Sequence, residues 1–366
     1  MNRQNFSRRK FLQTSGGILA ASATYGSDVF SLPVKRKIGV ALVGLGYYSR
    51  DLLAPALQLT KYCEIKGIVT GSPEKIPGWQ KKYGIPDANV YSYETMHEVA
   101  NNPEIDVIYI VVPTSLHKKY ALIAANAGKH VWCEKPMAMT AQDCQVIIDA
   151  CNKNKVRLAV GYRLQHEPNT QTVAEFARSK PFGAIESVIA KAGYAGGAPS
   201  PDHWRLKRDM GGGALYDMGV YPINAARYTT GEEPIAVTAK LEVERKAIFT
   251  EVDESAYLTL EFPSGIVAKC AASVGKEMNV LRATCENGWY ELSPMQSYTG
   301  VQGKTSDGRF LNKTIVNQQA GQMDDDALAI FHEKPVLAPG EMGMADIRVV
   351  EAALRSSAQG GKRIVL

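Results

Sequence analysis

The stretch that decides the fold reads Ile38-Gly39-Val40-Ala41-Leu42-Val43-Gly44-Leu45-Gly46-Tyr47-Tyr48-Ser49. Its apolar run, residues 38–43, is typical of a buried strand in a parallel sheet. The segment that follows, residues 49–60, has the apolar spacing of a helix. The junction has the pattern G-x-G-x-x-small, with Ser49 in the last position. This pattern predicts a turn that holds a pyrophosphate against a helix N-terminus.

The same alternation of strand and helix continues along the first half of the chain. Predicted strands cover residues 38–43, 65–69, 106–112, 130–133 and 158–160, and helical segments separate them. Strands that alternate with helices indicate a doubly wound α/β fold with a parallel sheet. We therefore assign residues 35–164 to an NAD(P)-binding Rossmann domain.

The pattern changes after residue 165. Strand-like runs at residues 186–195, 256–262 and 266–272 follow one another with few helices between them, and residues 196–209 read as a loop. Helical spacing is found at residues 213–228 and 342–357. We expect residues 165–366 to form an α+β domain for substrate binding and oligomerisation, with a large, mostly antiparallel open sheet. Two domains also suit a chain of 366 residues.

The end of the second strand indicates the type of dinucleotide. An NAD site usually has an acid there to bind the ribose 2′-hydroxyl, and an acid repels the 2′-phosphate of NADP. The chain instead reads Val69-Thr70-Gly71-Ser72-Pro73-Glu74-Lys75, which offers hydroxyl groups and an ammonium. The segment favours NADP over NAD.

Two further segments have residues suited to chemistry. Pro136 restricts Lys135, so Glu134-Lys135-Pro136 predicts a fixed turn at the carboxyl end of a strand, where doubly wound folds bind ligands. Gly211-Gly212-Gly213 precedes a predicted helix that contains Asp217 and Tyr221. Residues four apart share one face of a helix. By itself such a pair is more often a structural hydrogen bond than a catalytic pair.

Together these motifs resemble the Gfo/Idh/MocA family of sugar-related oxidoreductases, over nearly the whole chain after residue 35. The matching segments are Gly44-Leu45-Gly46, Glu134-Lys135-Pro136, Gly161-Tyr162-Arg163, Trp204-Arg205, Gly211-Gly212-Gly213 with Asp217 and Tyr221, and Pro339-Gly340-Glu341 with Gly343. Most of the family has His where this chain has Tyr221. Tyr221, and Asn224 in place of an acid, point to the glucose–fructose and aldose-type branch.

The resemblance implies a tightly held NADP, with Lys135 and Asp217 near the substrate and Tyr221 as acid/base. A lysine ammonium near a phenol favours the phenolate form, which accepts a proton. Lys135 would also polarise the substrate oxygen, and Asp217 would orient the sugar. The expected cofactor-binding residues are Gly44, Leu45, Gly46, Tyr48, Ser49, Thr70, Gly71, Ser72, Lys75, Tyr93, Pro113, His117, Glu134, Lys135, Arg163, Trp204 and Arg205. Trp204 could also stack on a sugar, and His117 could simply cap its helix.

The N-terminus reads as an export signal. Ser7-Arg8-Arg9-Lys10-Phe11-Leu12 is a twin-arginine pattern, a short weakly apolar stretch follows, and Ala21-Ser22-Ala23 suits cleavage. We expect residues 1–31 to be a signal peptide and the mature protein to be periplasmic, with no stable membrane insertion. The first 30 residues carry +3 of the formal +5, so the rest gives no sequence-wide case for nucleic-acid binding.

The remaining chemistry-bearing residues are given structural roles. We expect the six cysteines to be free buried thiols, because the twin-arginine route exports proteins already folded in a reducing compartment. Asp324-Asp325-Asp326 is read as a solvated helix start, and no metal site is expected. His166 and His203 are expected to have ordinary polar roles.

The leading functional hypothesis is hydride transfer between sugars through a bound NADP. An aldose would be oxidised to a lactone, and a second sugar or carbonyl compound would reoxidise the cofactor in a ping-pong cycle. The alternatives are an ordinary NAD(P)-dependent sugar or cyclitol dehydrogenase or reductase, an NAD-dependent glycosidase, and a non-enzymatic sugar-binding protein. The family resemblance also implies a homo-oligomer, either a dimer or a tetramer.

Overall fold

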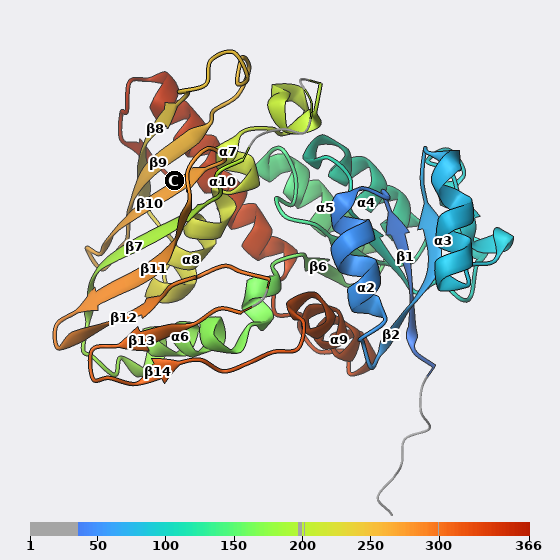
Figure 1. Cartoon of the computed structure of the whole chain (residues 1–366), viewed down its shortest axis with the longest axis horizontal. Coiled ribbons are helices and arrows are strands. Elements are labelled where there is room, and N and C mark those ends of the chain that lie inside the picture. The colour runs from blue at the N-terminus through green and yellow to red at the C-terminus, as the bar shows by residue number, and fades with distance from the viewer. Residues whose placement is uncertain (1–35, 197–199, 201, 299) are drawn as a thin grey trace, which may run out of the picture. The chain divides into compact units, whose positions relative to one another are not determined.

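Strand β1 (Ile38–Val43) is buried at every residue and lies inside a parallel sheet. The computed structural model describes residues 36–366 except 197–199, 201 and 299. In this part of the chain the sheet has the strand order β3-β2-β1-β4-β5-β6. Its other strands are β2 (Cys63–Val69), β3 (Val90–Tyr91), β4 (Val107–Ile110), β5 (His130–Cys133) and β6 (Leu158–Val160). Figure 1 labels its strands β1, β2 and β6. The order reverses between β1 and β4, and doubly wound folds bind ligands at the carboxyl ends of the strands at such a point.

Helices pack against this sheet, and one of them comes from the C-terminal part of the chain. Helix α9 (Gln318–Phe331) contacts α2 (Ala54–Leu57) and β2, and its Ala320, Met323 and Ala327 join the apolar core around β1. The other helices of this half are α3 (Ile76–Tyr83), α4 (His117–Asn126) and α5 (Ala141–Lys153). Short helical turns connect the elements: η1 (Tyr48–Leu53), η2 (Pro73–Lys75), η3 (Asp87–Asn89), η4 (Met96–Asn101), η5 (Thr114–Leu116) and η6 (Arg163–His166).

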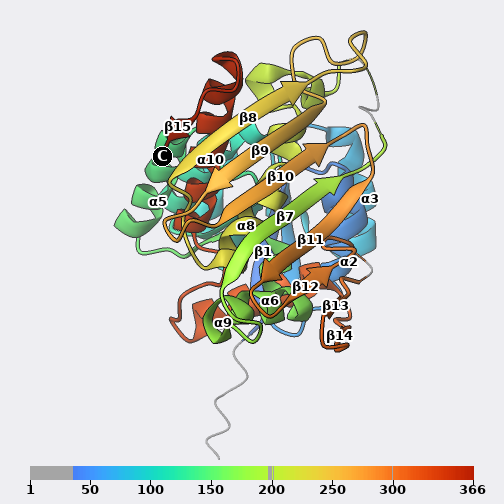
Figure 2. The ribbon, with the colours of Figure 1, turned by 90° about the vertical axis from the view of Figure 1, so that its left-hand side faces the viewer.

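The second sheet has the order β14-β13-β12-β11-β7-β10-β9-β8-β15. Neighbouring strands are antiparallel except β7 and β10, which are parallel. Figure 2 shows the strands in front, with α8 (Val220–Thr230) and α10 (Gly340–Ala358) behind them. The strands are β7 (Ile185–Gly193), β8 (Ala236–Glu242), β9 (Ser255–Glu261), β10 (Val267–Ser273), β11 (Met278–Cys285), β12 (Gly288–Leu292), β13 (Gly303–Thr305), β14 (Phe310–Leu311) and β15 (Ile364–Val365).

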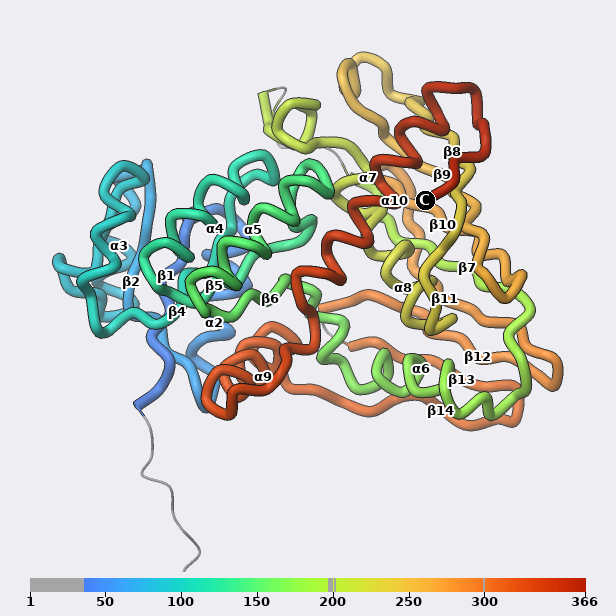
Figure 3. Tube along the Cα trace, turned by 180° about the vertical axis from the view of Figure 1, so that it is seen from behind, coloured from blue at the N-terminus to red at the C-terminus, as the bar shows by residue number. Residues whose placement is uncertain are grey.

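Helices α6 (Pro168–Ser179), α8 and α10 contact this second sheet. Helix α10 also contacts α5 and β6, so it packs against both sheets (Figure 3). Both sheets belong to one compact unit, Lys37–Leu366. The predicted fold class, a Rossmann sheet followed by a mostly antiparallel sheet, is confirmed, and the domain boundary near residue 164 stays a prediction.

Two predictions about helices are wrong. Residues 213–228 do not form one helix: α7 (Ala214–Asp217) ends before Gly219, and α8 begins at Val220. A β-carbon at Gly219 would lie 2.3 Å from the carbonyl oxygen of Leu215, so the chain passes too close to itself for a larger residue. The three acids at residues 324–326 lie in the middle of α9, because the Asn317 side chain caps that helix by accepting from the Ala320 amide.

All six cysteines are free and buried. Among the described residues, no helix combines the length and the apolar character needed to cross a bilayer. The predicted twin-arginine segment and its cleavage site lie outside the described residues.

Candidate active site

The glycine-rich turn after β1 has the geometry that its sequence predicts. Gly44 has a φ of +90°, and a β-carbon there would lie 2.6 Å from the Val111 carbonyl oxygen, so the turn accepts only glycine. The buried Ser49 hydroxyl donates to the Gly44 carbonyl oxygen at 2.5 Å and fixes the start of η1. A β-carbon at Gly46 would meet nothing within 4 Å. The turn therefore fits a dinucleotide phosphate, which needs close approach to the backbone at such a glycine.

The end of β2 lies beside this turn. Lys75 Nζ donates to the carbonyl oxygen of Leu45 at 3.4 Å, which joins the two segments. The Thr70 hydroxyl accepts from the Ser72 amide at 3.0 Å. Gly71 packs against Tyr93, since a β-carbon there would lie 2.9 Å from that ring. The structure thus places the predicted Thr70, Ser72 and Lys75 beside the glycine-rich turn.

Two predicted cofactor residues support the strand ends. His117 is buried, and its Nδ1 and Nε2 lie 2.9 Å from the Pro136 carbonyl oxygen and 2.8 Å from the Val112 carbonyl oxygen. Burial lowers the pKa of His117, and the hydrogen bonds to these two carbonyl oxygens oppose that shift. The Pro113 carbonyl oxygen accepts from the Leu116 amide at 2.9 Å. His117 therefore ties the end of β4 to the turn after β5.

Lys135 and Asp217 meet, as the sequence predicts. Lys135 Nζ donates to the Asp217 carbonyl oxygen at 2.7 Å and lies 3.7 Å from Asp217 Oδ1. Arg205 Nε donates to Asp217 Oδ2 at 3.0 Å. Burial opposes ionisation of Asp217, but Arg205 and Lys135 outweigh it and hold the pKa of that carboxyl below its usual range. Asp217 is therefore a buried carboxylate held by two cations.

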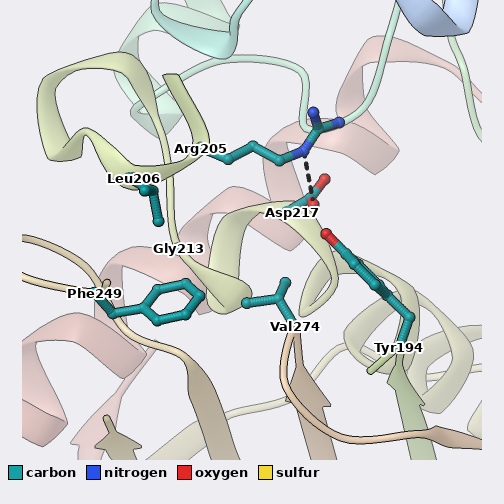
Figure 4. A pocket seen from close by; sticks show the side chains of 7 residues that line it. All are labelled: Tyr194, Arg205, Leu206, Gly213, Asp217, Phe249 and Val274. Atoms are coloured by element: carbon teal, nitrogen blue, oxygen red, sulfur yellow. Dashed lines mark hydrogen bonds and ion pairs between the residues drawn. The ribbon is translucent and has the colours of Figure 1, made fainter. Parts of the chain in front are cut away.

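Figure 4 shows a hollow beside this carboxylate, with the Tyr194 hydroxyl directed at Asp217. Burial and the charge of Asp217 raise the pKa of Tyr194 to about 12, so its phenol keeps its proton. Apolar side chains complete the hollow, which is lined by Tyr194, Arg205, Leu206, Gly213, Asp217, Phe249 and Val274. Tyr194 stands just past the end of β7, and no motif in the sequence singles it out.

Tyr221 lies at the start of α8 and is 8% exposed. Lys135 Nζ lies 4.5 Å from the centroid of its ring. The predicted proximity of the two residues is present, but the break before α8 separates Tyr221 from the helix of Asp217, and the ammonium bonds to the Asp217 carbonyl oxygen. The arrangement places an ionised acid, an ammonium and a phenol at the carboxyl end of β5.

Arg163 is the second cation near the Tyr221 ring. Its buried guanidinium lies 5.8 Å from the Tyr221 ring and 4.4 Å from the Tyr298 ring, and it bonds to Gln318 Oε1. Tyr48 packs near Tyr298, with ring centroids 6.4 Å apart. Burial, Glu134 and Tyr298 raise the pKa of Tyr48 well above its usual value. Tyr48 therefore lies beside Tyr298. Tyr298 and Gln318 are neighbours of Arg163 that the sequence did not reveal.

Glu134 is buried at the same strand end. The Tyr109 hydroxyl donates to Glu134 Oε1 at 2.8 Å, and the Lys135 amide donates to Oε2 at 3.2 Å. A β-carbon at Gly161 would lie 2.5 Å from Oε1, which explains the glycine at that position. Burial raises the pKa of Glu134 to about 7 despite these bonds.

Trp204 is stacked on His203 and Arg205. Its ring centroid lies 5.9 Å from that of His203, and the Arg205 guanidinium lies 4.5 Å from the ring. Arg205 reaches the catalytic candidates directly, whereas Trp204 reaches them through Arg205. Residues 197–199 and 201 of the preceding loop lie outside the described part of the chain.

The chain has a Rossmann sheet with a turn that fits a phosphate. A second sheet domain contributes an Asp and a Tyr to the ends of the Rossmann strands. Together these features define a class of dinucleotide-dependent oxidoreductase. The chain belongs to the Gfo/Idh/MocA family: residues 38–162 match the model "Oxidoreductase family, NAD-binding Rossmann fold", and residues 170–291 match the model "GFO/IDH/MocA C-terminal domain".

Three relatives are informative. The crystal structure of an aldose–aldose oxidoreductase from Caulobacter crescentus is 36% identical and superposes with a TM-score of 0.85, covering 90% of this chain and all of that chain. A D-xylose 1-dehydrogenase [NADP(+)] of Haloarcula marismortui is 25% identical, over 87% of this chain and 90% of its own. A D-xylose 1-dehydrogenase (NADP(+)) of Haloferax volcanii is 26% identical, over 87% of this chain and 95% of its own.

Proposed function

We propose that the protein transfers hydride between sugars through a tightly bound NADP. An aldose is oxidised at C1 to a lactone, and a second sugar or carbonyl compound is then reduced. The observation that carries the proposal is that Lys135 and Arg205 hold the Asp217 carboxylate, while the same Lys135 ammonium lies 4.5 Å from the Tyr221 ring centroid. The 36% identity to an aldose–aldose oxidoreductase supports sugars as substrates.

The side chains divide the chemistry among them. When bound, the nicotinamide accepts or returns a hydride. Tyr221 takes the proton of the hydroxyl that is oxidised, since a phenol beside an ammonium can act as an acid/base. Lys135 polarises the substrate oxygen, and the ionised Asp217 orients the sugar through its hydroxyl groups. The buried surroundings strengthen each of these charge interactions.

NADP is the proposed cofactor rather than NAD. Lys75, Thr70 and Ser72 supply an ammonium and hydroxyl groups at the end of β2. The two D-xylose dehydrogenases, which cover most of this chain, have NADP(+) in their names. Gly44, Leu45, Gly46 and Ser49 would hold the pyrophosphate.

Export would explain why the cofactor stays bound. The twin-arginine pattern of residues 7–12 favours a periplasmic location for the protein. The periplasm supplies no NADP. A cofactor loaded before export and regenerated in place gives a ping-pong cycle. We further propose a homo-oligomer, as the resemblance to the family implies.

The test uses the protein as purified. Absorbance of a bound nucleotide, and lactone formation from an aldose only when a second sugar is present, are expected. If the purified protein contains no nucleotide and consumes added NADP in proportion to lactone, the proposed cycle is wrong. That second result would instead support an ordinary NADP-dependent sugar dehydrogenase, which the names of the D-xylose relatives also favour.

A further inference from the structure

One face of α9 is polar although it is buried. Gln318, Gln322 and Asp326 follow one another at intervals of four residues, and each is 1% exposed. Residues four apart lie one above the other on a helix, so the three side chains form a stripe. A helix face turned to the protein interior is normally apolar. Gln318 and Gln322 each have one side-chain hydrogen bond, whereas neither carboxyl oxygen of Asp326 has a partner among the described residues.

Two members of the stripe contact residues of the candidate active site. Gln318 Oε1 accepts from Arg163 Nη1. Gln322 Nε2 donates to the Tyr109 hydroxyl at 3.1 Å, and that hydroxyl donates to Glu134 Oε1 at 2.8 Å. Helix α9 thus connects by two hydrogen bonds to the carboxyl beside Lys135.

The direction of this chain of hydrogen bonds is fixed while Glu134 is a carboxylate. A phenol has one O–H, which Tyr109 uses on Glu134, so its oxygen must accept from the next group. The amide nitrogen of Gln322 has protons to donate and satisfies that need. Tyr109 itself is fully buried, with its ring edge-on to Trp132 at 5.7 Å, so it has little freedom to turn away.

The Glu134 carboxyl has little room to move. The Gly161 backbone lies against it, the Tyr109 hydroxyl bonds to one oxygen, and the Lys135 amide bonds to the other. The titratable and charged groups that face it come from five elements: Tyr109 of β4, Cys133 of β5 with Lys135 after it, Tyr48 of η1, Arg163 of η6 and Tyr298 after β12. The carboxyl is thus fixed beside Lys135 at the carboxyl end of β5.

We propose that Gln322 and Tyr109 are positioning residues that fix Glu134 so that it takes up and releases one proton during turnover. This role rests on the proposed function. Oxidation of a sugar hydroxyl breaks one C–H and one O–H bond: the hydride leaves to the bound nicotinamide, and the proton passes first to Tyr221 and from there to Glu134. Glu134 changes from carboxylate to carboxylic acid when it takes that proton, and returns it when the second sugar is reduced. Burial, which raises the pKa of Glu134 to about 7, suits this exchange.

The first test needs no substrate. Infrared spectra of the whole purified protein with ¹³C-labelled glutamate, recorded against pH, give the titration of Glu134, which is identified by the band lost in Glu134→Gln. Tyr109→Phe removes a hydrogen bond that stabilises the carboxylate, so the midpoint should rise by about one pH unit. Gln322→Met, which keeps the Tyr109 hydroxyl, should move the midpoint in the same direction by less.

The matched control is Tyr290→Phe. It also removes the hydroxyl of a fully buried tyrosine, but Tyr290 lies on β12 of the second sheet and packs against Phe176 and Phe182. In Tyr290→Phe the infrared midpoint of the Glu134 titration should equal that of the unchanged protein. If Tyr109→Phe does not fold, Gln322→Met against the same control decides. An unchanged midpoint in the variants that fold overturns the proposal.

The second test is the pH profile of kcat. We expect kcat to change with pH near neutrality. In Tyr109→Phe the midpoint of this change should move by as much as the infrared midpoint. In Glu134→Gln the change should be absent. A profile that Glu134→Gln leaves unchanged overturns the proton-holding role. A protein that shifts its infrared midpoint as expected but oxidises no sugar refutes the proposed function instead, so the two failures are distinct.

Discussion

Lys135 and Asp217 are 82 residues apart, yet the ammonium of the first donates to the backbone carbonyl oxygen of the second at 2.7 Å. The bond links the turn after a Rossmann strand to the end of α7. It leaves the ammonium 3.7 Å from Asp217 Oδ1, where it shares the carboxylate with Arg205. The Lys135 side chain therefore does two things at once: it holds two parts of the fold together, and it supplies the positive charge nearest to Tyr221.

Lys135→Met should keep the length of the side chain and remove the charge. We expect kcat/KM to fall by about 10²–10⁴-fold, because polarisation of the substrate oxygen and support for acid/base catalysis are both lost. Steady-state kinetics with the best aldose measure the loss. Lys240→Met is the control, since its side chain is 75% exposed on β8 and should leave the rate unchanged. Activity within tenfold of the unchanged protein would contradict the assigned role.

Lys75→Met should change the choice of cofactor rather than the fold. A charge-assisted hydrogen bond to a phosphate contributes about 1.5–3 kcal/mol, so NADP affinity should fall by about 10–100-fold while NAD affinity changes little. Acid release of the nucleotide from purified protein, followed by chromatography, gives the ratio of NADP to NAD. Lys81→Met, at an exposed position of α3, serves as the control. An unchanged ratio would show that Lys75 does not contact the 2′-phosphate.

The sequence could predict those parts of the fold in which local pattern and tertiary structure agree. The run at residues 38–43 is apolar throughout because β1 is covered on both faces. Position 44 requires glycine because of its own backbone conformation. Glu134-Lys135-Pro136 was placed at a strand end because β5 stops there. In each case a few consecutive residues contain the whole signal.

The rest depends on contacts that no local pattern encodes. Asp326 appears in the sequence as part of an acidic, solvated run, but α9 turns it into the protein against η6. Tyr194 and Tyr298 reach the site from just beyond β7 and β12, in segments without a recognisable motif. The helix break at Gly219 could not be seen either, because the close approach to Leu215 is a property of the folded backbone.

Gly44 and Gly46 should respond to alanine in opposite ways. Gly44→Ala meets the Val111 carbonyl oxygen at 2.6 Å with φ at +90° and should cost about 1–3 kcal/mol of stability. Gly46→Ala meets nothing within 4 Å, so its stability should change by less than about 0.5 kcal/mol. Its methyl group would nevertheless stand where the pyrophosphate approaches, and bound nucleotide should fall at least tenfold. Thermal unfolding and nucleotide content measure the two effects, and equal nucleotide content in Gly46→Ala and the unchanged protein would place the phosphate elsewhere.

Asp326→Asn should make the stability of the protein less dependent on pH between about 4 and 7. Burial raises the pKa of Asp326 to about 7, with His166 opposing and Asp325 adding to the rise. In the unfolded chain an Asp has a pKa of about 3.9, so between pH 4 and 7 the folded protein holds a proton that the unfolded chain has lost. Stability therefore falls as pH rises through that window, and the loss is complete above the folded pKa. About three pKa units correspond to an upper limit of about 4 kcal/mol.

Asparagine has no proton to lose, so this part of the pH dependence should vanish. Urea unfolding at pH 5 and pH 8 should show a smaller loss of stability for Asp326→Asn than for the unchanged protein, and the variant should be the more stable of the two at pH 8. Asp149→Asn, at an exposed position of α5, is the control and should follow the unchanged protein. Parallel losses in Asp326→Asn and the unchanged protein would mean that Asp326 is ionised in the folded state at both pH values. The buried stripe of α9 would then contain a carboxylate rather than a carboxylic acid.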